Sequence, residues 1–310
     1  MSDSSPAGNV RWTRKHWLRG GILLGVLGIS AAILGTILYQ QWDVLVSYPW
    51  EFRPLPLLFA FGCYTLALFL VVWVWADMMH KLGYPIHFWK HFRYYCMTNL
   101  SKRLPGTVWY IAGRAQFYKE DGIPRRVTSA MSGVEMGVMV GAGIVISLIF
   151  GLPFLLRYQI NLWVIGGVFL GCILVLHPGV LRVAMRRLGA DVSGFGYRDL
   201  MTWVGVYLLV WISGGGILFF ICQIVVAVPL SNFGYMVGSW TLVGLLGVIF
   251  FFSPSNLGVS EVGFSLLLAT IMPPPVAVIV ALMVRILPFF YELLWALASM
   301  GLERGELSRN

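Results

Sequence analysis

Residues 237–272 read VGSWTLVGLLGVIFFFSPSNLGVSEVGFSLLLATIM, an apolar run interrupted near its middle by Ser253-Pro254-Ser255-Asn256-Leu257-Gly258. A membrane-spanning helix needs roughly 20 apolar residues, so this run is too long for one straight span. Proline breaks a helix, and broken backbone at membrane depth is tolerated only where protein buries it or a wet cavity adjoins it. The stretch therefore predicts a broken helical segment inside a bilayer.

The composition of the whole chain favours the same environment. Of the 310 residues, 58% are hydrophobic and only 11% are charged, and the mean hydropathy is +0.80. Soluble domains carry roughly 25% charged residues. We therefore predict an all-α integral membrane protein with one polytopic domain over residues 20–300, a basic head at 1–19 and a short tail at 301–310.

Six further apolar runs have the length of full spans, although the first resembles a signal peptide when it is read alone. Its apolar part is longer than a usual signal sequence and no convincing cleavage site follows, so we expect it to be retained. The expected full spans are Gly20–Tyr39, Pro54–Ala76, Thr128–Phe150, Leu162–Leu176, Leu200–Val228 and Val276–Met300.

A second interrupted region lies at His80–Arg126, where basic and aromatic residues alternate with apolar ones around Leu104-Pro105-Gly106. Nearly all of the 22 Lys and Arg residues lie in the head, in 77–127, in 177–199 or after Met300. This bias predicts a multi-pass protein of the cytoplasmic membrane with both termini in the cytoplasm. The basic loops fall on one side of the membrane only if each interrupted region enters and leaves the membrane on the same side. Both regions would then be re-entrant hairpins, the first opening inward and the second outward.

Interrupted segments in corresponding positions of two halves are typical of inverted-repeat transporters, so the breaks mark a candidate site. The alternative is that both breaks are ordinary kinks or interfacial turns.

Ionisable side chains within apolar spans are expensive and therefore suggest function. Glu135 lies in a span that also carries Gly133, Gly137 and Gly141, and its carboxylate serves either a pocket or a structural ion pair. Arg114 follows the first break, where it either binds a phosphate or anchors the inner face.

After the second break, Glu261 and Arg285 form a candidate pair. Burying the two together lowers the cost of placing either one alone in lipid. The pair is either functional or a structural clamp.

Several other classes of function receive little support from the sequence. The cysteines Cys63, Cys96, Cys172 and Cys222 lack the spacing of a metal or disulfide framework. His87 and His91 have i, i+4 spacing but share their face with no carboxylate or cysteine, which favours an interfacial stripe over a metal site. We expect no metal, no cofactor and no nucleic-acid partner, and no nucleotide-binding or hydrolase motif occurs.

The stretch Asn99-Leu-Ser-Lys-Arg-Leu-Pro-Gly106 with Arg114, then Glu135, then Ser253-Pro-Ser-Asn-Leu-Gly-Val-Ser-Glu261 with Arg285, resembles the flippase-like transmembrane family. This is the family of the membrane region of lysylphosphatidylglycerol synthases. The resemblance extends from about residue 20 to residue 300. It differs at Pro254-Ser255-Asn256-Leu257-Gly258, where the family often has Pro-Gly-Gly-Leu-Gly, and no aminoacyl-transferring domain follows Met300.

The resemblance implies movement of a polar-headed lipid between leaflets, such as a phospholipid, an aminoacylated lipid or a polyprenyl-linked sugar. The expected headgroup-binding residues are Asn99, Pro105, Gly106, Arg114, Glu135, Pro254, Asn256, Gly258, Glu261 and Arg285. We expect membrane lipids as partners, with a lipid-linked glycan, a homo-oligomer or a glycosyltransferase as further options. The alternatives to a transporter are an intramembrane enzyme that uses groups such as His91 and His177, or an accessory subunit acting on envelope precursors.

Overall fold

A computed structural model describes residues 31–101, 108–151, 177–187, 196–249 and 258–307, together with the isolated residues 28, 161, 163, 166, 167, 170, 171 and 174. Within these residues the fold contains helices and no strand. Five described helices are long and apolar enough to cross a membrane, and their bounds are Leu55–Lys81, Arg125–Phe150, Tyr197–Val225, Leu230–Ile249 and Pro274–Gly301. The all-α membrane fold predicted from composition is confirmed.

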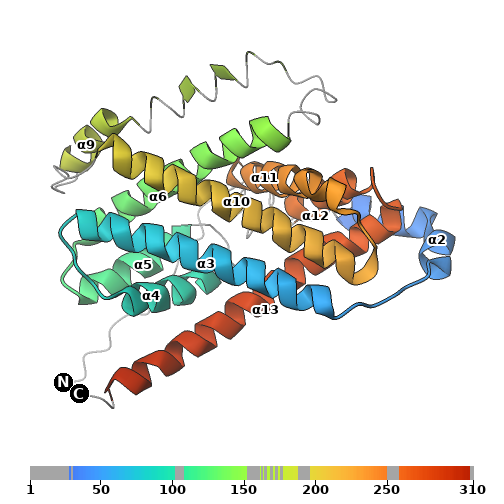
Figure 1. The fold of residues 1–310 in the computed structure, drawn as a ribbon, viewed down its shortest axis with the longest axis horizontal. Coiled ribbons are helices and arrows are strands. Elements are labelled where there is room, and N and C mark those ends of the chain that lie inside the picture. The colour runs from blue at the N-terminus through green and yellow to red at the C-terminus, as the bar shows by residue number, and fades with distance from the viewer. Residues whose placement is uncertain are drawn as a thin grey trace, which may run out of the picture.

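The described helices form two successive units with the same order of long and short elements (Figure 1). The first unit consists of α3 (Leu55–Lys81), α4 (Phe88–Ser101), α5 (Val108–Glu120) and α6 (Arg125–Phe150). The second consists of α10 (Tyr197–Val225), α11 (Phe233–Ile249), α12 (Val259–Leu268) and α13 (Pro274–Leu307). Each unit is thus a long helix, two shorter ones and a second long helix, which is the order expected of a repeat.

Three further elements are described. The helix α2 (Trp42–Ser47) precedes the first unit, the amphipathic α9 (Pro178–Arg187) lies between the units, and the short 3₁₀ helix η1 (Leu230–Asn232) lies within the second unit, just before α11. A short apolar helix over Ala31–Gln40 precedes α2.

Local sequence signals explain where the helices of the first unit begin and end. Pro54 and Pro124 precede α3 and α6, and proline suits a helix start because the first amides need no partner within the helix. Gly83 follows α3 and Gly122 follows α5, with φ of 83° and 80°. Glycine adopts this left-handed conformation readily, so both positions end a helix and redirect the chain.

The first helices of the two units run antiparallel. The amide of Arg53, just before α3, donates to Ile224 O near the end of α10 (2.9 Å). At the opposite end, Lys81 Nζ lies 2.8 Å from Asp199 Oδ1 near the start of α10. Figure 1 shows the two helices side by side along the long axis of the molecule. The second unit is therefore inverted relative to the first.

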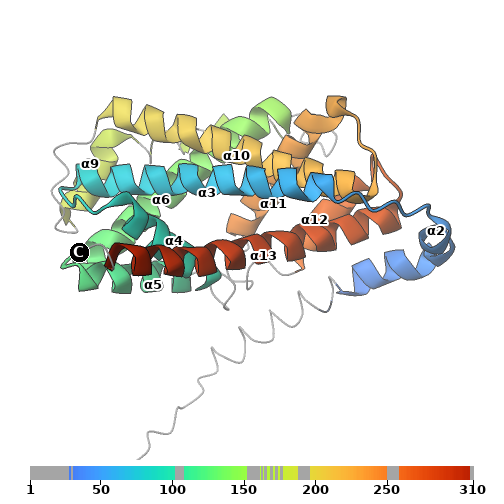
Figure 2. The same cartoon turned by 60° about the horizontal axis from the view of Figure 1, so that its bottom comes forward.

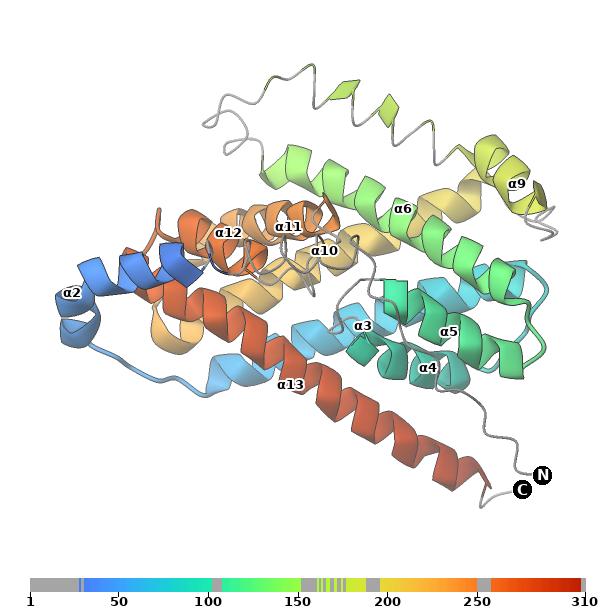
Figure 3. The ribbon, with the colours of Figure 1, turned by 180° about the vertical axis from the view of Figure 1, so that it is seen from behind.

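The two pairs of short helices enter the bundle from opposite ends. Lys90 at the start of α4 forms an ion pair with Asp121, just after α5, so both ends of the first pair meet near the end of α3. At the other end of the bundle, Tyr235 at the start of α11 donates to Leu267 O at the end of α12 (2.6 Å). Figure 3 shows α4 and α5 in one half of the molecule and α11 and α12 in the other. The two interrupted regions of the sequence thus form helix pairs that start from opposite ends of the bundle. The stretch Leu230–Ile249 is by itself long and apolar enough to cross a membrane, so the re-entrant insertion of the second pair stays a prediction.

Close packing holds the second hairpin against α10. A Cβ atom added at Gly215 would lie 2.5 Å from Val237 Cα, so the two backbones approach too closely for any larger residue. The ring of Trp240 occupies the equivalent space beside Gly214. The long helix α13 passes α3 and the first hairpin (Figure 2). On this helix, the indole of Trp295 donates to Thr65 Oγ1 over 3.0 Å.

The outer faces of the long helices are apolar. Leu58 and Leu66 on α3 and Leu294 and Leu297 on α13 are each more than half exposed. Large exposed apolar surface of this kind is costly in water and suits contact with lipid tails.

The observed bounds refine several predicted spans. α3 continues past Ala76 to Lys81, and α13 continues past Met300 to Leu307. The predicted span Gly20–Tyr39 is described only in part, as a short helix over Ala31–Gln40. The predicted span Leu162–Leu176 falls almost wholly outside the described residues.

Candidate functional site

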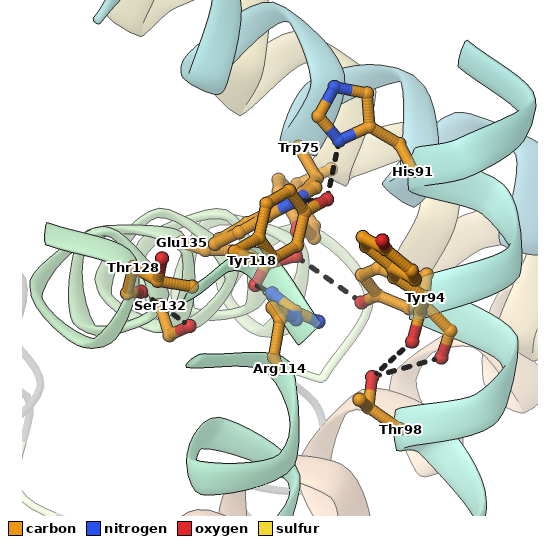
Figure 4. Close-up of polar contacts among 11 residues, drawn as sticks. Trp75, His91, Tyr94, Thr98, Arg114, Tyr118, Thr128, Ser132 and Glu135 are labelled. Atoms are coloured by element: carbon orange, nitrogen blue, oxygen red, sulfur yellow. Dashed lines mark hydrogen bonds and ion pairs between the residues drawn. The ribbon is translucent and has the colours of Figure 1, made fainter. Parts of the chain in front are cut away.

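A buried ion pair joins the first hairpin to α6. Arg114 Nη1 on α5 donates to Glu135 Oε2 on α6 over 2.6 Å (Figure 4). The side chains are 1% and 7% exposed, which excludes the surface-anchor role considered for Arg114. A buried pair is most stable when its remaining hydrogen-bonding groups are also engaged, and Arg114 meets this condition only in part, because its Nε and Nη2 have no hydrogen-bond partner among the described residues.

Aromatic side chains enclose this pair. The guanidinium carbon of Arg114 lies 4.1 Å from the ring centroid of Trp75 and 4.4 Å from that of Tyr95, so two rings attract it through cation–π interactions. The phenols of Tyr95 and Tyr207 both donate to Glu135 Oε1, over 3.2 and 3.1 Å. Each carboxylate oxygen of Glu135 therefore has a partner.

A short chain of hydrogen bonds continues from this cluster toward the end of the first hairpin at which α4 begins and α5 ends. The Trp75 indole donates to the Tyr118 hydroxyl over 2.7 Å, and His91 Nδ1 bonds the same hydroxyl (Figure 4). His177 bonds a different tyrosine, Tyr197. Among the described residues, no group of three or more His, Cys, Asp or Glu side chains is placed to hold a metal ion.

A second ion pair joins the second hairpin to α13, as the sequence predicts. Arg285 Nη1 lies 3.0 Å from Glu261 Oε1. The other oxygen of Glu261 accepts from the Gly258 amide (2.8 Å) and from the Ser260 hydroxyl (2.9 Å). A carboxylate at this helical position satisfies amides that the first turn leaves unpaired, so Glu261 also caps α12.

The two ion pairs occupy equivalent places in the two units. In each unit the second short helix pairs with the following long helix, through Arg114 and Glu135 in the first and Glu261 and Arg285 in the second. Along the chain, the arginine precedes the glutamate in the first unit, whereas the glutamate precedes the arginine in the second. This correspondence supports the inverted repeat independently of helix order.

A cavity of about 410 Å³ lies between the two clusters. Its polar lining comes from Tyr95 and Asn99 in the first unit and from Tyr207, Ser260, Arg285 and Glu292 in the second. Apolar and aromatic side chains complete the wall, among them Tyr64, Ala67, Leu68, Trp211, Trp240 and Phe264. Both hairpins and all four long helices thus contribute to one partly polar space.

The predicted site residues fall into three groups. Asn99 and Arg285 line the cavity, whereas Arg114, Glu135, Gly258 and Glu261 lie behind the lining residues. The remaining predicted residues, Pro105, Gly106, Pro254 and Asn256, lie outside the described residues.

The sequence prediction did not identify Tyr95 and Tyr207 as site residues. Tyr95 stands four residues before Asn99 and so shares its helix face, which is a usable signal. For Tyr207 the sequence offers no comparable signal. Gly133, which lies on the same helix as Glu135, makes no close helix contact, because no atom lies within 4 Å of a Cβ added there. A close contact on α6 occurs at Gly143, where an added Cβ would lie 3.0 Å from the ring of Trp211.

A comparison with known protein families finds a match over most of the chain. The model of the family described as "Lysylphosphatidylglycerol synthase TM region" matches residues 22–296, a stretch that includes both hairpins and both ion pairs. No curated protein matches the chain. The family match supports a membrane protein that acts on lipids. The chain therefore belongs to the family of the lysylphosphatidylglycerol synthase transmembrane region.

Proposed function

We propose that this protein moves a polar-headed lipid between the two leaflets of the cytoplasmic membrane without changing it covalently. The observation that carries the proposal is the cavity of about 410 Å³ whose lining comes from two hairpins inserted from opposite ends. A hydrated headgroup crosses hydrocarbon only if polar groups replace its water, and this cavity offers such groups within the bundle.

The contrast between the interior and the outer face supports a path in which only the headgroup enters. Asn99, Ser260 and Glu292 line the cavity, whereas the outer faces of α3 and α13 expose leucines such as Leu66 and Leu297. Apolar acyl or polyprenyl chains remain favourable on such a surface. The headgroup of a phospholipid, an aminoacylated lipid or a polyprenyl-linked sugar would then move through the cavity while its chains stay in lipid.

The inverted repeat supports access from each leaflet in turn. Two units of the same architecture and opposite direction can rock about a site at their interface, which is how inverted-repeat transporters expose one site alternately. The cavity lies at such an interface, with α3, α4 and α6 on one side and α10, α11, α12 and α13 on the other. We place both termini in the cytoplasm from the distribution of Lys and Arg.

A liposome assay tests the proposal. The purified chain is reconstituted with trace fluorescent lipids carrying glycerol-phosphate, aminoacylated or sugar-phosphate headgroups, and a membrane-impermeant quencher reports how fast each lipid reaches the outer leaflet. We expect acceleration for at least one headgroup, with unchanged lipid masses after extraction. Acceleration for none of them, by a chain that remains folded, would refute transport. A covalently altered lipid would favour an enzyme instead.

A further inference from the structure

The two buried ion pairs differ in how firmly each arginine is held. The side chain of Arg114 is 1% exposed, and its guanidinium carbon lies within 4.4 Å of the ring centroids of both Trp75 and Tyr95, so protein encloses it. Arg285 is 19% exposed at its side chain and lines the cavity. A ligand in the cavity can therefore contact the second guanidinium but not the first.

Both carboxylates have partners besides the arginine, since Glu135 also accepts from the phenols of Tyr95 and Tyr207. If Arg285 moved, Glu261 would still accept from the Gly258 amide and from the Ser260 hydroxyl. A buried carboxylate that keeps two hydrogen bonds loses much less than one left with none. Separation of the second pair is therefore the less costly of the two, because Arg285 reaches the cavity and Arg114 does not.

The surroundings of Arg285 favour an anion. Its Nη1 lies within 3.5 Å of the Ser260 hydroxyl, next to the N-terminal end of the ten-residue helix α12. The start of a helix carries partial positive charge, and a guanidinium presents parallel N–H donors that match two phosphate oxygens. Both features would act on one phosphate in the cavity.

We infer that Arg285 exchanges its resting partner Glu261 for the phosphate of the transported headgroup, and that Glu261 is the counter-ion that weakens this binding. The inference rests on the proposed function, since it names the chemistry that the cavity recognises. The exchange leaves the number of charges in the cavity wall unchanged, because Glu261 stays on its cap while the phosphate takes its place at Arg285.

A competing counter-ion suits a transport site. A substrate must bind strongly enough to enter and weakly enough to leave. Without Glu261, the phosphate would lose the competitor that contacts the guanidinium at 3.0 Å, and Glu292 would be the remaining carboxylate among the named lining residues. With Glu261 2.8 Å from the Gly258 amide and 3.0 Å from Arg285, the carboxylate can recapture the arginine as the headgroup departs.

Binding to the full-length protein in detergent tests the exchange. Equilibrium dialysis measures the affinity for three radiolabelled probes: dihexanoyl phosphatidylglycerol, dihexanoylglycerol and inorganic phosphate. The first carries the phosphate on a lipid, the second lacks it, and the third lacks the lipid. We expect the phosphatidylglycerol probe to bind best, and preference for free inorganic phosphate would exclude a lipid headgroup as the source of the anion.

Glu261→Gln is the decisive variant. Glutamine can still accept from the Gly258 amide, so the cap of α12 is retained while the competing charge is removed. We expect phosphatidylglycerol to bind about tenfold more tightly than to the wild type and lipid movement to slow, because release is impaired. Weaker or unchanged binding by Glu261→Gln would overturn the inference.

Arg285→Ala is expected to weaken phosphatidylglycerol binding by about a hundredfold, and Arg285→Lys by less, because lysine keeps the charge but not the planar fork. Arg53→Ala serves as the matched control, since Arg53 lies in an exposed ion pair with Glu51. If the wild type moves lipid but these variants bind every probe alike, the exchange is wrong and transport stands. If binding follows the prediction but no lipid moves, the proposed function fails and the anion site stands.

Discussion

The phenols of Tyr95 and Tyr207 donate hydrogen bonds to the same oxygen of Glu135, over 3.2 and 3.1 Å. Tyr95 belongs to the first hairpin and Tyr207 to the first long helix of the second unit. Both residues also line the cavity. The carboxylate of Glu135 therefore ties the two units together at the point where the cavity wall is polar.

Removing either phenol should weaken the bundle. A hydrogen bond to a charged group contributes about 2 kcal/mol, so Tyr95→Phe and Tyr207→Phe should each lower the free energy of unfolding by about that amount. Denaturant unfolding in detergent micelles measures the change. Tyr39→Phe is the control, because Tyr39 is 85% exposed. Identical stability in Tyr95→Phe and the wild type would contradict this role of the phenol.

Neutralising Glu135 alone should be worse than neutralising both charges. Glu135→Gln leaves the buried Arg114 without a counter-charge, which typically costs about 3–5 kcal/mol. Combining it with Arg114→Met removes the uncompensated charge, so the double variant should recover part of the loss. A double-mutant cycle of unfolding free energies measures the coupling. Simple additivity of the two losses would show that the charges do not depend on each other.

Filling the cavity should slow transport without unfolding the protein. Ala67 lines the cavity, and Ala67→Phe would occupy the space meant for the headgroup. An added barrier of about 1.4 kcal/mol slows a step tenfold, so we expect at least about a tenfold slower appearance of labelled lipid in the outer leaflet. The matched control is Leu66→Phe on the lipid-facing side of the same helix, where Leu66 is 54% exposed. Equal slowing by both variants would place the path elsewhere.

Gly258 should tolerate no side chain. Its φ is 86° and its ψ is −43°, a conformation that costs a residue with Cβ about 1–3 kcal/mol. Gly258→Ala should destabilise the protein by that amount. It should also disturb the hydrogen bond that the amide of residue 258 donates to Glu261. Gly62→Ala is the control, because a Cβ there meets no atom within 4 Å and alanine favours a helix. A stable Gly258→Ala variant would show that the turn before α12 relaxes freely.

Apolar run length and its interruptions were enough to predict most of the fold. The run at 237–272 was too long for one helix and contained Pro254 and Gly258, and the structure divides its described part into α11 and α12. Such a prediction succeeds because the bilayer imposes a length on every helix and penalises unsatisfied backbone wherever the helix breaks. The helix ends shifted by several residues, as at Lys81, because capping and packing rather than hydropathy decide them.

The candidate site was predictable only in part. A charged side chain in lipid is costly and requires a partner. For this reason the sequence alone identifies Glu135, Glu261 and Arg285 as candidate residues. The neighbours in the last two helices, Glu261 and Arg285, were correctly paired. Arg114 was assigned either to phosphate or to the inner surface, whereas it is bound to Glu135 between aromatic rings.

The sequence by itself therefore determined which residues enter the membrane, where the helices break and which charges need compensation. Only the tertiary structure decided that Tyr95 and Tyr207 converge on one carboxylate, that Arg114 is enclosed and that Arg285 faces the cavity. The physical reason is that hydropathy and helix breaking act on neighbouring residues of the chain. Hydrogen bonds and cavity walls arise instead where helices far apart in sequence pack against one another, and no local pattern records that meeting.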